Sequence, residues 1–339
     1  MNILTERLVA GEVICAEGYL FECERRGYLQ AGAFVPEVVL EHPEVVEELH
    51  REFVHAGSDV VEAFTYYGHR GKLRVIGKED VLEPLNRRAL ELASEVARET
   101  GTLLAGNLSN TNLFQPTAEM RREVRSMFEE QVSWAVDAGV DYVIAETYSW
   151  LDEALIALEV IRSAGLPSVV TFTVNRTGHL RSGEAPEEAC RQAEAAGADV
   201  VGLNCARGPR SMLPILERIR ATVACPMAAL PVPYRTTEEQ PTMQSLVDPE
   251  QPERPFPTGL DPFTCTRYEI ADFGRAARAL GVSYLGVCCG AGPHHVRALA
   301  EALGRTPPAS RYDPDMSRHS YLGNDPAISQ SNRAYAADL

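Results

Sequence analysis

The feature that most constrains the fold is an alternation of short apolar runs with amphipathic segments along almost the whole chain. The runs are rich in Val, Leu, Ile and Ala, as strands buried on both faces of a parallel sheet are. They cover residues 13–17, 60–66, 103–109, 142–148, 168–174, 200–206, 226–232 and 284–290. The segments between them have apolar residues three and four positions apart, which is the helical period. They cover residues 80–99, 119–138, 151–164, 186–196, 212–222, 268–280 and 293–303.

This alternation places the chain in the α/β class. Eight strands with helices between them predict a closed parallel (β/α)₈ barrel, the TIM barrel, which commonly uses about 250 residues as one domain. An open doubly wound sheet is the alternative, but no strand is followed by the glycine-rich dinucleotide fingerprint of such folds. We therefore expect a barrel over residues 1–303, with a long connection (231–263) after the seventh strand. Residues 304–339 lack clear periodicity and are expected to form a C-terminal arm.

The charge balance excludes several classes of partner. Asp and Glu number 48 against 32 Lys and Arg, which gives a net charge of −16. Nucleic acids and anionic membranes are bound by basic surfaces, so neither is an expected partner. No run approaches the roughly 18 apolar residues of a membrane span, and the first seven residues contain no apolar signal core. We therefore expect a cytoplasmic protein.

The eight cysteines are expected to be free thiols or metal ligands rather than disulfides. Neighbouring side chains on a strand point to opposite faces, so the adjacent pair Cys288 and Cys289 cannot easily bridge. A large chain without a signal peptide also favours a reducing compartment. Those without an evident grouping are expected to be structural: Cys15, Cys23, Cys190, Cys225 and Cys265.

Three cysteines lie at the carboxyl ends of two of the predicted strands, at the barrel end where active sites lie. They are Cys205, Cys288 and Cys289. Three thiolates can hold a zinc ion and leave its fourth tetrahedral position open for a substrate, as in catalytic sites. The alternative is that each is a small buried hydrophobe. The grouping of three at one rim favours a metal site.

Two motifs around these cysteines resemble the zinc-binding motifs of the homocysteine S-methyltransferases. They are Gly-Leu-Asn-Cys at 202–205 and Gly-Val-Cys-Cys-Gly at 286–290. Within the family, the betaine–homocysteine enzymes are the most similar, and the resemblance extends from residue 4 to about residue 303. Other similar segments are 26–28, 41–44, 49–53, 64–67 and 144–146.

The resemblance implies a zinc-dependent methyltransferase that forms methionine. The thiolates of Cys205, Cys288 and Cys289 would bind Zn²⁺, and the sulfur of homocysteine would take the open position. Zinc deprotonates a bound thiol near neutral pH, so the sulfur could attack a methyl group of a cationic, betaine-like donor. Positioning and removal of water would then supply most of the catalysis.

The resemblance also assigns the donor site. Phe34, Tyr66 and Tyr67 correspond to aromatic residues that would surround a methylated cation through cation–π contacts. Phe34 stands where the betaine enzymes have Trp. The hydroxyl of Tyr67 would lie near the metal, and Glu146 corresponds to a carboxylate near both substrates.

The first strand departs from the family pattern. Family members have Asp-Gly-Gly there, and the acid holds the amino group of homocysteine, whereas this chain has Glu17, Gly18 and Tyr19. Either Glu17 holds the ammonium group with a shifted backbone, or the pocket accepts another thiol. A sulfonium or other N-methylated donor, a zinc hydrolase and an inactive binding barrel also remain open as alternative functions.

The tail is similar at 307–310 and 315–316 to the start of an arm that contacts a partner subunit, which implies a homo-oligomer.

Overall fold

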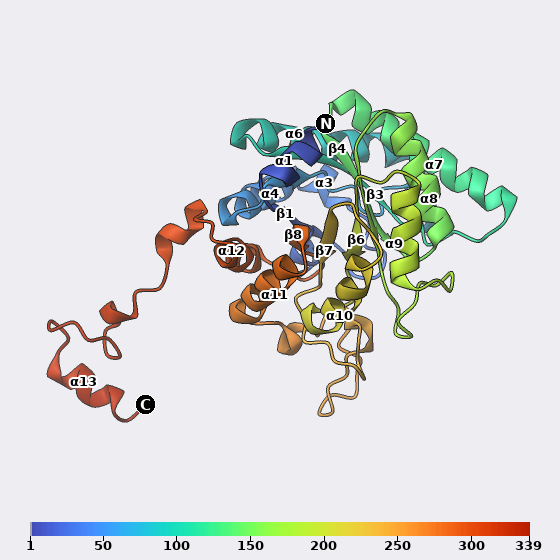
Figure 1. Cartoon of the computed structure of the whole chain (residues 1–339). Coiled ribbons are helices and arrows are strands. Elements are labelled where there is room, and N and C mark those ends of the chain that lie inside the picture. Colours follow the sequence, from blue (N-terminus) through green and yellow to red (C-terminus); the bar gives the residue numbers. More distant parts are fainter. Residues whose placement is uncertain (1) are drawn as a thin grey trace.

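A computed structural model describes residues 2–339 and shows a closed barrel of eight parallel strands (Figure 1). The strands pair in sequence order, and β1 closes the barrel by pairing with β8, from Val13 opposite Tyr284 to Ala16 opposite Val287. The predicted (β/α)₈ fold is confirmed, and the open sheet is excluded. The strands are β1 (Val13–Ala16), β2 (Val60–Glu62), β3 (Leu103–Ser109), β4 (Tyr142–Tyr148), β5 (Ser168–Phe172), β6 (Val200–Asn204), β7 (Met227–Leu230) and β8 (Val282–Val287).

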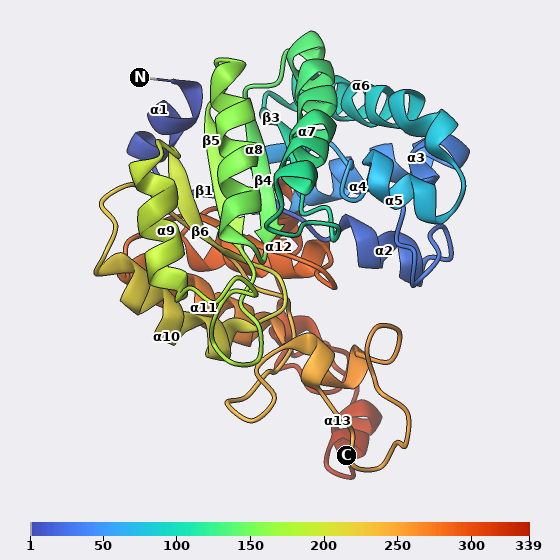
Figure 2. The same ribbon diagram turned by 90° about the vertical axis from the view of Figure 1, so that its right-hand side faces the viewer.

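The helices surround this barrel (Figure 2). All seven predicted helices are present: α6 (Leu82–Thr100), α7 (Ala118–Ala138), α8 (Leu151–Ser163), α9 (Pro186–Ala195), α10 (Pro209–Arg220), α11 (Arg267–Ala279) and α12 (Pro293–Ala302). The remaining helices were not predicted: α1 (Ile3–Ala10), α2 (Tyr19–Arg25), α3 (Val38–Glu41), α4 (Pro43–Ala56), α5 (Arg70–Val75) and α13 (Gln330–Ala336). At the end of α7, Gly139 adopts a left-handed conformation (φ 71°), in which glycine is favoured because it has no Cβ.

Several strands end earlier than the apolar runs predict. β2 ends at Glu62 although its run continues to Tyr66, and β6 ends at Asn204, directly before Cys205. The chain then turns through left-handed backbone conformations, with φ of 60° at Tyr67 and 58° at Cys205. Cys205 is buried and Tyr67 partly buried in these loops, so burial alone could not mark where each strand stops. Such conformations in non-glycine residues are uncommon and often occur at functional sites.

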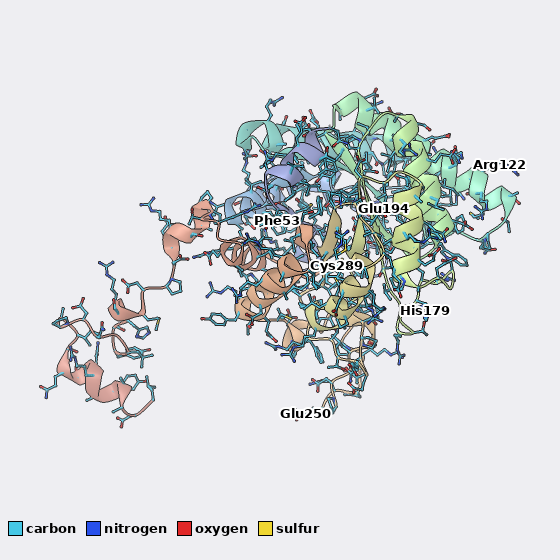
Figure 3. The ribbon with its side chains drawn as sticks, in the orientation of Figure 1. Phe53, Arg122, His179, Glu194, Glu250 and Cys289 are labelled. Atoms are coloured by element: carbon cyan, nitrogen blue, oxygen red, sulfur yellow. The ribbon has the colours of Figure 1, made fainter. Side chains whose placement is uncertain are left out.

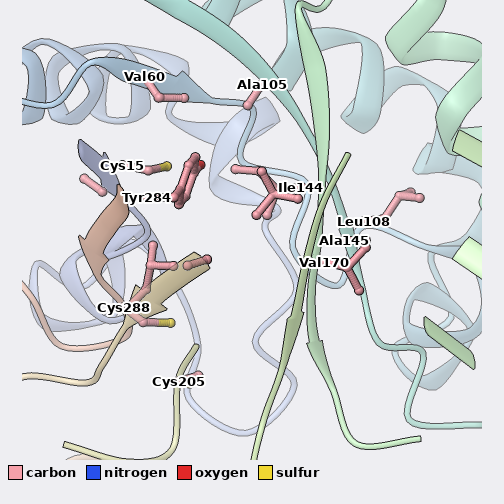
Figure 4. Close-up of a cluster of buried hydrophobic side chains, with 14 of the residues drawn as sticks. Cys15, Val60, Ala105, Leu108, Ile144, Ala145, Val170, Cys205, Tyr284 and Cys288 are labelled. Atoms are coloured by element: carbon pink, nitrogen blue, oxygen red, sulfur yellow. The ribbon is translucent and has the colours of Figure 1, made fainter. Parts of the chain in front are cut away.

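Large side chains fill the barrel interior. Tyr142 and Tyr284 are fully buried, and their hydroxyls hydrogen-bond to each other at 2.9 Å. Figure 4 shows Tyr284 near Cys15 in this core, with Cys288 and Cys205 beyond it. The closely packed interior gives the residues at its mouth a rigid support.

The two predicted irregular segments leave the barrel as expected. The connection from β7 to α11 is held at its base by a bridge between Tyr234 and Thr264. After α12, a short 3₁₀ turn (Pro308–Tyr312) contacts α4, and the tail with α13 then extends away from the barrel (Figure 1). No helix within residues 2–339 is both long and apolar enough to cross a membrane.

Candidate metal centre and active site

The three predicted metal ligands meet at the mouth of the barrel. The sulfur atoms of Cys205, Cys288 and Cys289 all lie within 4.8 Å of one another, and all three residues are buried. Cys289 lies near the centre of the molecule in Figure 3. The other five cysteines are also free thiols, so the expected absence of disulfides holds for all eight.

Backbone contacts fix the loops that carry these thiols. The amide of Cys205 donates to the carbonyl of Leu230, and the amide of Cys288 donates to the carbonyl of Pro231, so both loops are tied to the end of β7. Gly290 adopts φ of 91°, and a Cβ there would lie 2.1 Å from the hydroxyl of Tyr234. Only glycine can therefore follow the cysteine pair in this conformation.

The chemistry of the cluster fits a soft metal ion. Hydrogen bonds from Cys288 and Cys289 hold the pKa of Cys205 well below its usual value, whereas burial raises the pKa of Cys288. The cluster therefore favours one thiolate even when the other two thiols keep their protons. Metal binding requires thiolates, and thiolate ligands select zinc and other soft ions. Three ligands from the protein leave a tetrahedral ion one position for a substrate.

Three carboxylates lie beside the thiols, joined by two amides. Asn107 Nδ2 donates to Oε1 of both Glu62 and Glu146, at 2.5 Å in each case. Asn204 Nδ2 donates to Glu146 Oε2 at 2.6 Å and to Glu17 Oε2 at 3.1 Å. The other carboxylate oxygen of Glu17 is buried without a hydrogen-bond partner. Glu17, Glu62 and Glu146 together form what we call the acidic cluster.

The acidic cluster brings three buried carboxyl groups together without a cationic partner in the part of the chain that the structure describes, which penalises their charged forms. Burial, followed by the charge of Glu146, raises the pKa of both Glu17 and Glu62 well above the usual value. Burial also raises the pKa of Glu146 to about 7. No Lys, Arg or His among residues 2–339 forms an ion pair with any of the three. Since a buried charge without a partner is costly, this geometry favours a bound cationic group.

Sequence reasoning did not identify Glu62. It lies within an apolar run, where an acidic residue is unexpected. That unexpected acid was the one sequence feature that could have marked Glu62 as a site residue. In the structure Glu62 is buried and lines one small cavity together with Glu17, Glu146, Cys288 and Cys289.

The predicted aromatic residues are only partly brought together. The rings of Tyr66 and Tyr67 lie 4.3 Å apart between centroids, and Tyr66 lines the same cavity as the acidic cluster. Burial raises the pKa of Tyr67, and the nearby Cys205 and Cys289 raise it further. The ring of Phe34 instead stacks on Phe21 at 5.8 Å and does not line that cavity.

At the end of β1, where the sequence departs from the family pattern, the chain turns directly into α2. At Gly18 a Cβ would lie 2.1 Å from the carbonyl oxygen of Ala291, so glycine is required there. The ring of Tyr19 lines the cavity, stacks on Phe64 at 5.6 Å, and hydrogen-bonds through its hydroxyl to His50 Nδ1 at 3.0 Å. Tyr19 therefore forms a fixed wall of the cavity.

Comparison with known proteins identifies the family. The sequence profile of the homocysteine S-methyltransferases matches residues 20–303. The chain belongs to this family. It is 36% identical to betaine–homocysteine S-methyltransferase 1 of Xenopus tropicalis, over 91% of this chain and 78% of the relative. It is also 35% identical to S-methylmethionine–homocysteine S-methyltransferase BHMT2 of Mus musculus, over 91% of this chain and 84% of the relative.

A solved member of the homocysteine methyltransferases supports the fold. The metallated form of MmuM from Escherichia coli superposes with a TM-score of 0.70 at 18% identity, covering 88% of this chain and 99% of that one. The sequence resemblance to the homocysteine S-methyltransferase family is thus confirmed, and the protein is a methyltransferase. Its cysteine cluster is a site that could hold the metal on which catalysis in this family depends.

Proposed function

We propose that this homocysteine S-methyltransferase moves a methyl group from a betaine-like cationic donor to homocysteine, and that its metal is zinc. The observation that carries the proposal is the trio of buried thiols, Cys205, Cys288 and Cys289, of which Cys288 and Cys289 line a cavity that the acidic cluster also lines. Zinc, when bound to these thiolates, would lower the pKa of a substrate thiol and keep it reactive at neutral pH.

The acidic cluster is proposed to hold the ammonium group of homocysteine. The unpartnered, buried oxygen of Glu17 is available to accept a hydrogen bond from it. Asn204 joins Glu17 to Glu146, and Asn107 joins Glu146 to Glu62, so the three carboxyl groups form one connected group in the cavity. Gly18 lets the chain turn close to Ala291, which keeps the Glu17 carboxylate in the cavity.

The donor is proposed to bind against Tyr66 and Tyr67. Their adjacent rings offer electron-rich faces to a methylated cation, and Tyr66 lines the same cavity as Glu146. Phe34 was predicted for the same site; because its ring packs on Phe21, its contact with a donor stays a prediction.

The proposed reaction is a direct displacement. The sulfur of homocysteine attacks the methyl carbon, a carbon–sulfur bond forms, and the carbon–nitrogen bond of the donor breaks with its electron pair moving to nitrogen. The positive nitrogen of the donor and the negative sulfur both become neutral, so exclusion of water from the buried site favours the transition state. The side chains of Glu17, Tyr66 and Tyr67 would act by holding the reactants in line.

A sulfonium donor is the second candidate. The name of the mouse relative states that it uses S-methylmethionine, and that relative is almost as similar to this chain as the betaine enzymes are. The same displacement would then break a carbon–sulfur bond of the donor.

Zinc-loaded protein incubated with homocysteine and a panel of donors distinguishes these candidates. The panel contains glycine betaine, other N-methylated betaines, S-methylmethionine and dimethylsulfoniopropionate, and mass spectrometry detects methionine and each demethylated donor. Methionine with a demethylated betaine supports the proposal. Methionine only from sulfonium compounds favours the second candidate, and no methionine from any donor overturns both.

The C-terminal arm is proposed to contact a second copy of the chain. Residues 304–339 follow the barrel of residues 1–303 and expose large apolar side chains, among them Met316, Leu322 and Tyr335. Such side chains on an extended segment are typical of an interaction surface. Light scattering of the full chain should show a dimer or a larger homo-oligomer; a monomer would contradict this.

The free thiols also lead us to propose a cytoplasmic location.

A further inference from the structure

The chain contains only two lysines, and their surroundings differ. Lys78 forms ion pairs with Glu37 and Glu41. Lys72 is partly buried, and within residues 2–339 its side chain has neither an ion pair nor a hydrogen bond. Its Nζ instead lies over the ring of Tyr67, 4.4 Å from the centroid.

The backbone holds Lys72 at this position. α5 begins after His69, whose Nδ1 accepts a hydrogen bond from the amide of Lys72. The next residue, Leu73, is fully buried, so the helix is anchored against the barrel. Burial lowers the pKa of Lys72, because no opposite charge compensates for the loss of water around its ammonium group.

Lys72 changes what the Tyr67 ring can bind. A second cation at this ring would lie close to the first, and two like charges at short range in a partly buried site repel strongly. A donor that also carries a carboxylate removes this conflict, because the carboxylate can pair with Lys72 while the methylated cation contacts the rings.

We propose that Lys72 binds the carboxylate of the methyl donor and thereby makes the site selective for zwitterionic donors. This inference rests on the proposed function and adds a charge requirement to it. A cation contacts an aromatic ring within about 6 Å of its centroid. Both charges of the donor would therefore lie near Tyr67, which fits a carboxylate one or two carbons from the methylated nitrogen or sulfur.

The test compares two ligands with the same trimethylammonium group. Glycine betaine carries a carboxylate where choline carries a hydroxymethyl group. Isothermal titration calorimetry of the zinc-loaded full chain gives the dissociation constant of each ligand. The readout is the dissociation constant of choline divided by that of glycine betaine. The variants are Lys72→Met, the charge-conserving Lys72→Arg, and Lys78→Met as the matched control. Zinc content and circular dichroism of each variant verify that the fold and the thiol cluster are intact.

Lys72→Met should reduce the ratio by about 10- to 100-fold, the usual effect of losing one hydrogen bond to a charged group. Lys72→Arg should restore most of the ratio, and Lys78→Met should leave it as in the parent. If Lys72→Met still binds betaine and the ratio is unchanged, the proposed role of Lys72 is wrong, whereas the proposed betaine-like donor is not affected. If the parent binds no betaine, the betaine-like donor proposed above is wrong, and the role of Lys72 falls with it.

Discussion

Asn204 donates a hydrogen bond of 2.6 Å to Glu146 from the position directly before Cys205. One residue thus connects the thiol cluster to the acidic cluster, and Asn107 extends the connection to Glu62. Because Asn204 is the last residue of β6, the connection is anchored to the barrel wall. The proposed metal site and the proposed ammonium site therefore form one rigid unit, and damage to either is expected to affect the other.

Metal content is the first prediction. We expect about one zinc per chain, bound by Cys205, Cys288 and Cys289. Cys288→Ala should reduce metal affinity by at least the roughly 10- to 100-fold that loss of an outer-shell partner typically causes. Metal analysis after dialysis measures this. Cys190→Ala is the matched control, because Cys190 is equally buried but belongs to no thiol cluster. Undiminished zinc in Cys288→Ala would contradict the assignment.

The second prediction separates donor binding from metal binding. Tyr67→Ala should raise the KM for the donor or lower kcat, because it removes a ring worth about 0.5–2 kcal/mol to a bound cation. Zinc content should stay at the parent value. Tyr268→Ala is the control, since Tyr268 is 79% exposed. Parent-like kinetics of Tyr67→Ala with every donor would remove Tyr67 from the donor site.

How far the sequence predicts this site depends on the residue. The thiols were predictable because their positions follow from the order of strands in a barrel. The packing of the Phe34 ring was not, because its left-handed backbone (φ 53°) and the position of Phe21 direct the ring, and neither is visible in local sequence. The end of β2 was also hidden, since Ala63 and Phe64 remain buried beyond it. Side-chain contacts between distant segments, such as Asn107 with Glu62, follow only from the folded barrel.

The third prediction concerns acid stability. Burial lowers the pKa of His50 to about 3, so the folded protein keeps this ring neutral while the unfolded chain takes up a proton near pH 6.5. The unfolded state therefore binds more protons between these values, and stability falls as the pH falls below 6.5. At pH 5 this group should cost about 2 kcal/mol relative to neutral pH.

Urea unfolding at pH 7 and pH 5 measures that loss. In His50→Gln the loss of unfolding free energy between the two pH values should be smaller than in the parent by about 2 kcal/mol. The comparison uses the difference in unfolding free energy between two pH values. The cost of losing the contact between His50 and Tyr19 is the same at both and therefore cancels. His55→Gln serves as control, because His55 is a second histidine on α4, one turn and one residue beyond His50, and is not among the buried residues of that helix. Equal losses in His50→Gln and the parent would show that the ring is not held neutral.

The last prediction concerns the ammonium group of homocysteine. If Glu17 binds it, the contact is a charge-assisted hydrogen bond worth on the order of 1.5–3 kcal/mol. Glu17→Gln should then weaken homocysteine use by roughly 10- to 100-fold. Glu62→Gln should have a smaller effect in the same direction, because Glu62 adds charge while its Oε1 already accepts from Asn107. A thiol without an amino group, such as 3-mercaptopropionate, should be used equally by all three proteins.

Titration of both thiols against the parent and the variants decides between Glu17 and Tyr19. Glu44→Gln is the control, since that carboxylate is 70% exposed. If Tyr19 instead blocks the ammonium group, Glu17→Asp will not improve homocysteine use, whereas Tyr19→Gly will. The ring of Tyr19 lines the cavity and is fixed by Phe64 and His50, so Tyr19→Gly removes a rigid wall and tests its effect directly. Equal affinity for homocysteine in the parent and in Glu17→Gln would remove Glu17 from the acceptor site.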